Sequence, residues 1–437
     1  MRHLAACSVV MVLSIFLGPS KVLSQDDAKM LILEQPSDAT SWSSWSRTDK
    51  DGASLNNARS PKLDNGEIVI EPGAGLLSAP FPVQAFHYYQ IDFDARAEGR
   101  PLIRILYTDA TGKDLPDHST GMDRSGIFKA QTSFSRAKMD ACHARILIQA
   151  HQQPVVLRSL QVHPAGNDAV NTWANEEYPA LPDLPDRLFA TDHSEVARSV
   201  RGRLISSKHF RIVLLGDSIM NDTGNSPMDV LISKHYPGLY LEIVTSVENA
   251  KGSSFYKEEG RVARYVTSKR PDLVLIGGIS HGDDIESLAY VVDQIQSQLS
   301  CPILLLSGAV GPNGDPRLWS EPPEAGEIPP ATEWAKKVCE LATTQGVGFF
   351  DIEQAWGTAI MRGIPPYEDY LRDPIHANSR GQLVLARLLE RFFSQTEKSP
   401  THSSGSKKNP PLSLPSALRN YPKSLSLFSA PTGHAIW

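Results

Sequence analysis

The sequence predicts an α/β protein in which an antiparallel β-sandwich precedes a parallel sheet. Short segments of alternating apolar and polar residues fill the region 28–165, a pattern typical of antiparallel strands joined by turns. From 208 to 395, apolar segments alternate with segments of helical length, which is typical of βαβ units with a sheet buried on both faces. We therefore expect a sandwich domain, a linker over 166–207 and an α/β domain.

The strands expected in the sandwich are short. Residues 88–95 alternate with a period of two, and a turn follows the next strand at 109–112. The expected strands are 88–95, 102–107, 126–130, 144–149 and 155–162. The linker is punctuated by prolines and is expected to contain one helix, over 194–206.

Continuous apolar runs mark the strands of the α/β domain. We expect these strands at 211–215, 240–245, 272–277, 302–307 and 347–352. Helices are expected at 226–236, 256–268, 284–299, 331–345, 353–361 and 379–393. In a parallel sheet of this kind, ligands bind at the carboxyl ends of the strands.

Composition limits the classes of function. At about 100–200 residues per domain, 437 residues allow two or three domains. The chain has 41% hydrophobic and 21% charged residues, as in folded globular proteins rather than disordered ones. Its formal net charge is −6, with no basic cluster in the region expected to fold, which argues against nucleic acid as a partner.

The two ends of the chain differ from the rest. Residues 1–24 have the pattern of a signal peptide: a basic start, an apolar run over 4–17 and small or apolar residues before a cleavage site. The run is too short to span a membrane, so we expect a secreted or periplasmic protein without a membrane span. Residues 396–437 are rich in Ser and Pro and are expected to form a disordered tail, or alternatively a sorting or surface-attachment segment.

Cysteine usage gives no framework for a metal or for disulfides. Beyond the signal segment the chain has Cys142, Cys301 and Cys339, and none belongs to a CxxC motif. Cys301 with Cys339 is the one pair to be tested as a disulfide, while small buried hydrophobic positions are the favoured interpretation.

Two segments carry the residue types of nucleophilic catalysis. Gly216-Asp217-Ser218 ends the strand expected at 211–215, where a serine is exposed to a substrate. Serine needs a base to remove its proton. Asp373 and His376 lie three residues apart before the last helix, so the carboxylate can fix the imidazole tautomer while the other ring nitrogen faces Ser218.

These motifs, with the βα alternation between them, resemble the SGNH hydrolases, also called the GDSL esterase/lipase family. The resemblance covers roughly 208–395 and implies a flavodoxin-like α/β/α fold. It implies Ser218 as nucleophile, His376 as base and Asp373 as the residue that orients the base. It implies neither a cofactor nor a metal.

The resemblance also implies an oxyanion hole. Its donors are the backbone N–H groups of Ser218 and Gly252, the latter within Glu248-Asn249-Ala250-Lys251-Gly252, and an asparagine of a third block. That block departs from the family here, because Gly278-Ile279-Ser280-His281 contains no asparagine. Ser280 or His281 is expected to replace it. One lost oxyanion donor costs about 10²–10³ in turnover.

Three further local interpretations remain open. Ser226-Pro227 is expected to begin a helix, with Ser as the cap and Pro at the first helical position. Asp217 is expected to shape its turn rather than react. His281, Asp283 and Asp284 suggest a metal cluster, but a loop with a helix cap is favoured.

Aromatic residues suggest a sugar site in two places. Substrate-lining rings are expected in loops at the active end of the sheet, with local packing as the favoured alternative: Trp319, Tyr367 and Tyr370. The sandwich resembles galactose-binding-like or carbohydrate-binding jelly rolls. There, four rings form either a sugar platform or, as favoured, core and interface positions: Trp42, Trp45, Tyr88 and Tyr89.

These observations together predict a secreted serine esterase that hydrolyses acyl esters, in the first place O-acetyl groups on a carbohydrate or polysaccharide. The absence of a long apolar lid from the sequence argues against a lipid substrate. Two alternatives are a non-catalytic carbohydrate-binding protein that retains the fold and a cell-surface protein acting through the sandwich and tail. The sequence indicates no oligomeric state.

Overall fold

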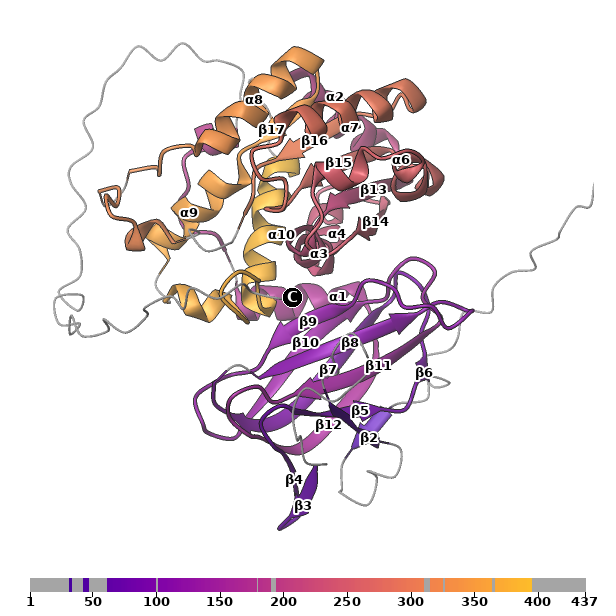
Figure 1. Ribbon diagram of the computed structural model, residues 1–437, viewed down its shortest axis with the longest axis vertical. Coiled ribbons are helices and arrows are strands. Elements are labelled where there is room, and N and C mark those ends of the chain that lie inside the picture. The colour runs from indigo at the N-terminus through magenta and orange to yellow at the C-terminus, as the bar shows by residue number, and fades with distance from the viewer. Residues whose placement is uncertain are drawn as a thin grey trace, which may run out of the picture. The chain divides into compact units, whose positions relative to one another are not determined.

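A computed structural model describes most of the chain between residues 31 and 394 (Figure 1). The described ranges are 31–33, 42–46, 61–99, 101–178, 180–189, 194–309, 315–324, 327–363 and 366–394. The expected signal peptide (1–24) and tail (396–437) lie outside these ranges. All described residues belong to one compact unit, so the boundaries expected at 166–207 stay a prediction.

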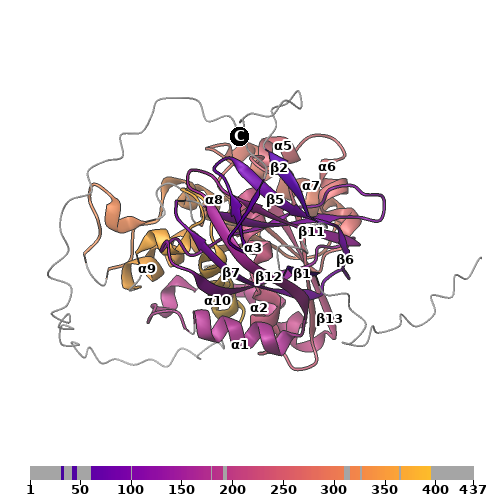
Figure 2. The same ribbon diagram turned by 90° about the horizontal axis from the view of Figure 1, so that it is seen from below.

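The amino-terminal region is built from two antiparallel sheets. One sheet has the order β10 (Lys129–Arg136), β7 (Tyr88–Ala97), β12 (Val155–Ala165), β4 (Glu67–Ile70) and β3 (Lys62–Asp64), with β1 (Leu31–Leu33) also paired to β12. The other has the order β2 (Trp42–Ser46), β5 (Ala74–Ser78), β11 (His143–Gln149), β8 (Leu102–Thr108) and β9 (His118–Gly121), with β6 (Phe81–Pro82) also paired to β11. Strands β7 and β12 run side by side in both views (Figures 1 and 2).

The two sheets share one apolar core. Strand β8 buries every second residue, as its alternating sequence predicts. Ile103 and Ile105 of β8 join Ile91 and Phe93 of β7 in the same buried cluster. The described residues therefore form a β-sandwich, as expected. Trp42 belongs to this core and Tyr88 is 3% exposed, so neither presents a ring to a ligand.

The carboxy-terminal region contains a five-stranded parallel sheet. Its order is β14 (Tyr240–Val247), β13 (His209–Gly216), β15 (Leu273–Gly277), β16 (Ile303–Leu306) and β17 (Gly348–Phe350). Leu214 packs in one buried cluster and Leu215 in another, because successive strand residues face opposite sides. Both faces are thus buried, as the continuous apolar runs predict. The chain order reverses beside β13, so the carboxyl ends of β13 and β15 flank a switch point, the usual place for a ligand site.

The helices that cover this sheet begin and end close to the predicted positions in most cases. They are α2 (Ser194–Ser206), α4 (Met228–Ser233), α5 (Ser253–Tyr256), α6 (Arg261–Tyr265), α7 (Ile285–Gln298), α8 (Glu333–Gln345), α9 (Ile352–Arg362) and α10 (Ser379–Ser394). The helix expected over 256–268 is divided, because Gly260 has a φ of +76° between α5 and α6.

Two helices are missing from the sequence-based assignment. The linker contains α1 (Asn167–Glu177). Another helix, α3 (Ser218–Asn225), directly follows β13, and Ser226 caps its carboxyl end. The expectation that Ser226 begins a helix was wrong, since Pro227 is the N-cap of α4.

Candidate active site

Ser218 is the first residue of α3, at the carboxyl end of β13. The preceding Gly216 has a φ of +152°, and a Cβ there would lie 2.1 Å from the Gly277 carbonyl oxygen. Only glycine allows this close approach of β13 to β15. Asp217 is the N-cap, and its Oδ1 accepts a hydrogen bond from the Ile219 N–H at 2.9 Å. The serine is therefore held at a helix amino terminus, at the switch point of the sheet.

Asp217 also joins the two loops that flank the switch point. Its Oδ2 accepts hydrogen bonds from the backbone N–H groups of Ile279 at 2.7 Å and Ser280 at 2.6 Å. Gly278, with a φ of +109°, has no side chain to obstruct this contact, since a Cβ there would lie 2.3 Å from Asp217 Oδ1. Asp217 thus shapes the turn, as expected.

His376 lies beside Ser218 although 158 residues separate them in sequence. The imidazole Nε2 is 2.8 Å from Ser218 Oγ. The Nδ1 is 2.9 and 2.8 Å from the two carboxylate oxygens of Asp373. If Nδ1 carries its proton toward Asp373, Nε2 is the acceptor that faces the serine hydroxyl. The structure thus brings all three predicted side chains together in the predicted order.

The Asp373 carboxylate is held in its ionised form. Burial would raise the pKa of Asp373, but the hydrogen bond and charge of His376, together with the Arg372 charge, lower the pKa below its ordinary value. Its Oδ1 also accepts the backbone N–H groups of Ile375 and His376, each at 3.0 Å. A turn stabilised by its own carboxylate therefore fixes both the position and the tautomer of His376.

A buried ion pair is hydrogen-bonded to the backbone next to this turn. Asp222, on the first turns of α3, is completely buried and accepts a hydrogen bond from Arg372 Nη1 at 2.8 Å. Its other oxygen accepts the Ala377 N–H at 3.1 Å, and Arg372 also donates to the Ala377 carbonyl. Asp222 and Arg372 thus connect the helix that begins at Ser218 to the segment that carries His376. The sequence does not predict this pair, because no local pattern joins residues 150 positions apart.

The predicted oxyanion donors differ in how they are placed. Ser218 begins α3 and Gly252 precedes α5, so neither backbone N–H has an acceptor within its helix. Gly252 packs directly on the backbone of the next loop, since a Cβ there would lie 2.0 Å from the Ser280 carbonyl oxygen. Ser280 is half-buried, and its hydroxyl makes no hydrogen bond within the described part of the chain.

The geometry of His281 contradicts its expected role as an oxyanion donor. Its Nε2 lies 2.8 Å from the Gly277 carbonyl oxygen, and its Nδ1 lies 2.7 Å from Ser253 Oγ. The ring also stacks on Trp334 with 5.8 Å between centroids. Both nitrogens are occupied inside the loop, and burial lowers the pKa of His281. His281 braces the loop, so Ser280 is the remaining candidate.

The metal interpretation of this loop is also unsupported. Asp284 caps α7 by accepting the Ser287 N–H at 3.0 Å, as the favoured reading predicted. Within the described ranges, no three His, Cys, Asp or Glu side chains gather as a metal site requires. Among the described residues, Cys142, Cys301 and Cys339 form no disulfide, so the pair Cys301 and Cys339 is not bridged.

The aromatic residues expected to line a substrate cleft are mostly packed inside. Tyr367 is 6% exposed and Tyr370 is 1% exposed, and both rings contact Trp356 edge-on. Neither can stack on a ligand, so local packing is the correct interpretation for both. Trp319 is half-buried in the loop after β16, where its sugar-binding role stays a prediction.

The sandwich contacts the helix that begins at Ser218. The side-chain amides of Asn221 and Asn225 on α3 donate to the Asp117 carbonyl at 2.9 and 3.2 Å. Lys138 donates to the Asn225 side chain, and Arg136 donates to the Gly224 carbonyl at 2.5 Å. Besides Ser218, four of the eight residues of α3 contact either the sandwich or the segment that carries His376: Asn221, Asp222, Gly224 and Asn225.

Comparison with known proteins is limited to weak structural likenesses. No protein-family model matches the sequence, and a search of curated proteins finds no match. Among solved structures, a two-domain esterase active on acetylated mannans has 15% identity and a TM-score of 0.36, over 46% of this chain and 56% of that one. The match thus spans little more than half of that esterase.

Two further solved structures show similar values. The acetylxylan esterase Axe2 from Geobacillus stearothermophilus, solved as a catalytic mutant, has 16% identity and a TM-score of 0.32, over 43% of this chain and 95% of that one. A family two carbohydrate esterase from Cellvibrio japonicus has 13% identity and a TM-score of 0.22, over 83% and 99%. At these identities and TM-scores the likenesses assign no activity to this chain. No helix in the described ranges is both long and apolar enough to cross a membrane.

Proposed function

We propose that this protein is a serine esterase of the SGNH hydrolase type. The observation that carries the proposal is the hydrogen-bonded series from Ser218 Oγ through the His376 imidazole to the Asp373 carboxylate, with contacts of 2.8 to 2.9 Å. The order of the parallel strands, second-first-third-fourth-fifth in chain order, is that of flavodoxin-like folds and supports the same family.

The proposed reaction follows from the position of each group. His376 Nε2 removes the Ser218 proton as the hydroxyl oxygen attacks the ester carbonyl, and Asp373 stabilises the imidazolium that forms. The N–H groups of Ser218 and Gly252, with the Ser280 hydroxyl, stabilise the negative oxygen of the tetrahedral intermediate. The imidazolium returns the proton to the leaving alcohol. Water, activated by the same imidazole, then hydrolyses the acyl-enzyme.

The proposed substrate is an O-acetyl ester on a carbohydrate. The expected export and the sandwich support a carbohydrate substrate. The sequence shows no long apolar lid of the kind that would favour a lipid substrate. Gly252 packs against Ser280, whose N–H donates to Asp217 beside the nucleophile, and the small size of both residues suits a short acyl group. The alternative, a carbohydrate-binding protein without activity, draws on the absent third-block asparagine.

The test is acetate release by the full chain. A small chromogenic acetate and acetylated mannan, xylan and pectin are the substrates, with longer acyl esters for comparison. We expect acetate release that falls by about 10⁶ in the Ser218→Ala protein, while Ser297→Ala, an exposed serine on α7, retains full activity. Equal thermal unfolding of the variants shows that they are folded. If no substrate releases acetate above the Ser218→Ala level, the acetyl-esterase proposal fails.

A further inference from the structure

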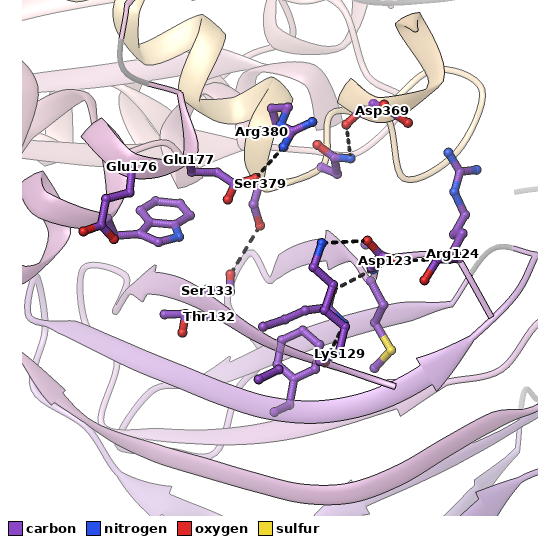
Figure 3. Close-up of a pocket in the computed structure, with 18 residues that line it drawn as sticks. Asp123, Arg124, Lys129, Thr132, Ser133, Glu176, Glu177, Asp369, Ser379 and Arg380 are labelled. Carbon is purple, nitrogen blue, oxygen red and sulfur yellow. Dashed lines mark hydrogen bonds and ion pairs between the residues drawn. The ribbon is translucent and has the colours of Figure 1, made fainter. Parts of the chain in front are cut away.

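A cavity of about 710 Å³ lies apart from the Ser218 hydroxyl, and none of Ser218, Asp373 and His376 lines it. One wall is formed by β7, β10 and the loop at 122–125 of the sandwich, and the other by α1 and the start of α10 (Figure 3). Its volume is within the range of about 300–1,000 Å³ that small-molecule sites occupy. The proposed esterase mechanism makes no use of this cavity.

Two ion pairs lie in the wall of the cavity. Lys129 Nζ lies 3.0 Å from Asp123 Oδ2, and Arg380 Nη2 lies 3.0 Å from Glu177 Oε1 (Figure 3). Arg124, the third basic group, donates to the Glu368 carbonyl at 2.8 Å. Because every basic side chain here already has an acceptor, the cavity offers little attraction to an anionic ligand.

Acceptor groups remain available in the same space. The carboxylates of Glu176 and Asp369 line the cavity, and neither makes a side-chain hydrogen bond within the described part of the molecule. A carboxylate can only accept hydrogen bonds, so each suits a ligand that offers O–H donors. On the facing wall (Figure 3), Thr132 Oγ1 donates to Asp92 Oδ1 at 2.6 Å and Ser133 Oγ lies 3.3 Å from Ser379 Oγ. Both oxygens can still accept a hydrogen bond.

One large aromatic side chain, Trp173, also lines the cavity. Its ring packs against Phe134 with 5.2 Å between centroids, so one side of the indole is fixed while the residue remains half-exposed. An indole presents a flat apolar surface beside a polar tip. A pyranose ring needs this combination, because its C–H face is apolar and its edge carries hydroxyls.

The wall on the α10 side is rigid before any ligand binds. The Asn378 amide donates to the Asp369 carbonyl at 2.8 Å and accepts the Gly381 N–H at 3.1 Å. Asn378 thus caps α10, which begins at Ser379. Asn378 is separated from His376 by a single residue. The segment that carries the proposed base therefore also forms part of the cavity wall. Pre-organised walls reduce the entropic cost of binding.

We propose that this cavity binds a neutral oligosaccharide, at a site separate from Ser218, through the indole of Trp173 and the carboxylates of Glu176 and Asp369. The inference goes beyond the proposed esterase and does not require that the chain hydrolyse an ester. A glycan chain held here is adjacent to the segment that carries His376, so the site gives the sandwich a direct role in holding a polymer.

The test measures binding with the full-length Ser218→Ala protein, which separates binding from hydrolysis. Isothermal titration calorimetry compares unacetylated manno-, xylo- and cello-oligosaccharides with oligogalacturonates and chitosan oligosaccharides. We expect a neutral oligosaccharide to bind most tightly. Glu176→Gln, a change at an exposed position, should weaken binding about tenfold, as expected for a lost hydrogen bond to a charged group. Trp173→Ala should weaken it at least as much.

Two controls make the result interpretable. Glu340→Gln, an exposed glutamate on α8, should leave the dissociation constant unchanged. With Ser218 present, Glu176→Gln should leave hydrolysis of the small acetate unchanged. The inference is overturned if no neutral oligosaccharide binds, if a charged oligosaccharide binds more tightly, or if Glu176→Gln binds like the parent. Loss of esterase activity with binding intact contradicts only the proposed function.

Discussion

The β-sandwich and the α/β region each have an apolar core, but the surface between them buries charged and polar side chains. One apolar cluster lies in the sandwich and two lie around the parallel sheet. The surface between the sandwich and helices α3 and α4 instead buries Arg136 in an ion pair with Asp229 of α4, and Lys138 beside two asparagines of α3. Apolar burial stabilises each region but tolerates many relative orientations. Directional hydrogen bonds and ion pairs are compatible with a single relative orientation of the two regions. In that orientation they also hold α3, the helix that begins at Ser218.

The same contrast appears at α10, which follows His376. His118 of β9 lies 2.7 Å from Ser135 Oγ and 3.1 Å from Gln382 Oε1. Burial lowers the pKa of His118 to about 3, so its ring stays neutral. The neutral ring connects one hydroxyl, of Ser135, to one side-chain amide, of Gln382. Polar contacts from the sandwich therefore reach both elements that carry the proposed nucleophile and base.

The largest effect should come from within the α/β region. Asp373→Asn removes the acceptor that orients His376 and favours the wrong tautomer, so turnover should fall by about 10⁴. Asp369→Asn, an exposed carboxylate four residues earlier, is the matched control and should retain activity on a small acetate. The measurement is the initial rate on that ester. Comparable rates for the two variants would contradict the assigned role of Asp373.

The next effect tests the polar surface itself. Arg136→Met leaves Asp229 buried without its cation, and breaking a buried pair in this way costs about 3–5 kcal/mol. Glu333→Gln breaks an exposed pair with Lys336 and should leave the free energy of unfolding almost unchanged, because exposed ion pairs contribute little. Urea unfolding measures both free energies. A small loss for Arg136→Met would show that the polar surface contributes no more than an exposed ion pair.

Ser280→Ala tests the oxyanion site by removing the proposed side-chain donor. Turnover should fall about 10²–10³-fold, which corresponds to about 2.7–4 kcal/mol of transition-state stabilisation. Stability should change little, since the Ser280 contact to Asp217 is made by the backbone N–H. The informative comparison is kcat against KM. An unchanged kcat would contradict the role of the Ser280 hydroxyl and would mean that only backbone N–H groups form the oxyanion hole.

The smallest effect is a dependence of stability on pH. Burial, followed by the charge of Arg136, lowers the pKa of Lys138 to about 7 from an ordinary value of 10.5. Between these two values the unfolded chain binds a proton that the folded chain does not, so this lysine makes stability increase as pH rises from about 7 to 10.5. In Lys138→Met that part of the slope should disappear. Parallel slopes for the parent and the variant would contradict the burial of an uncharged lysine.

Features that depend on neighbouring residues could be predicted from the sequence, whereas features that depend on tertiary contacts could not. Asp373 and His376 lie three residues apart, and the apolar runs of β13 to β16 carry their own signal, so both were accessible from local pattern. The Asp222–Arg372 pair was not accessible, because it depends on the packing of α3 against a segment 150 residues away.

Helices α1 and α3 were missed for a related physical reason. Residues 221–225 read Asn-Asp-Thr-Gly-Asn, and these residue types have low helix propensity. The helix forms because Asp217 caps it and because every residue after Ser218 is buried. In α1 only Val170 and Ala174 are buried, so its apolar stripe is too narrow to identify. Tertiary contacts decide both helices. The ring partners of His281 are likewise tertiary, so the sequence left open whether His281 or Ser280 is the third oxyanion donor.

The most direct test of the central claim is covalent labelling of the nucleophile. A fluorophosphonate probe reacts with a serine only when a base activates its hydroxyl. The proposed site predicts a single adduct on the peptide that contains Ser218, absent from Ser218→Ala and strongly slowed in His376→Ala. A label on another serine, or labelling of Ser218 that proceeds at the same rate without His376, would contradict the account.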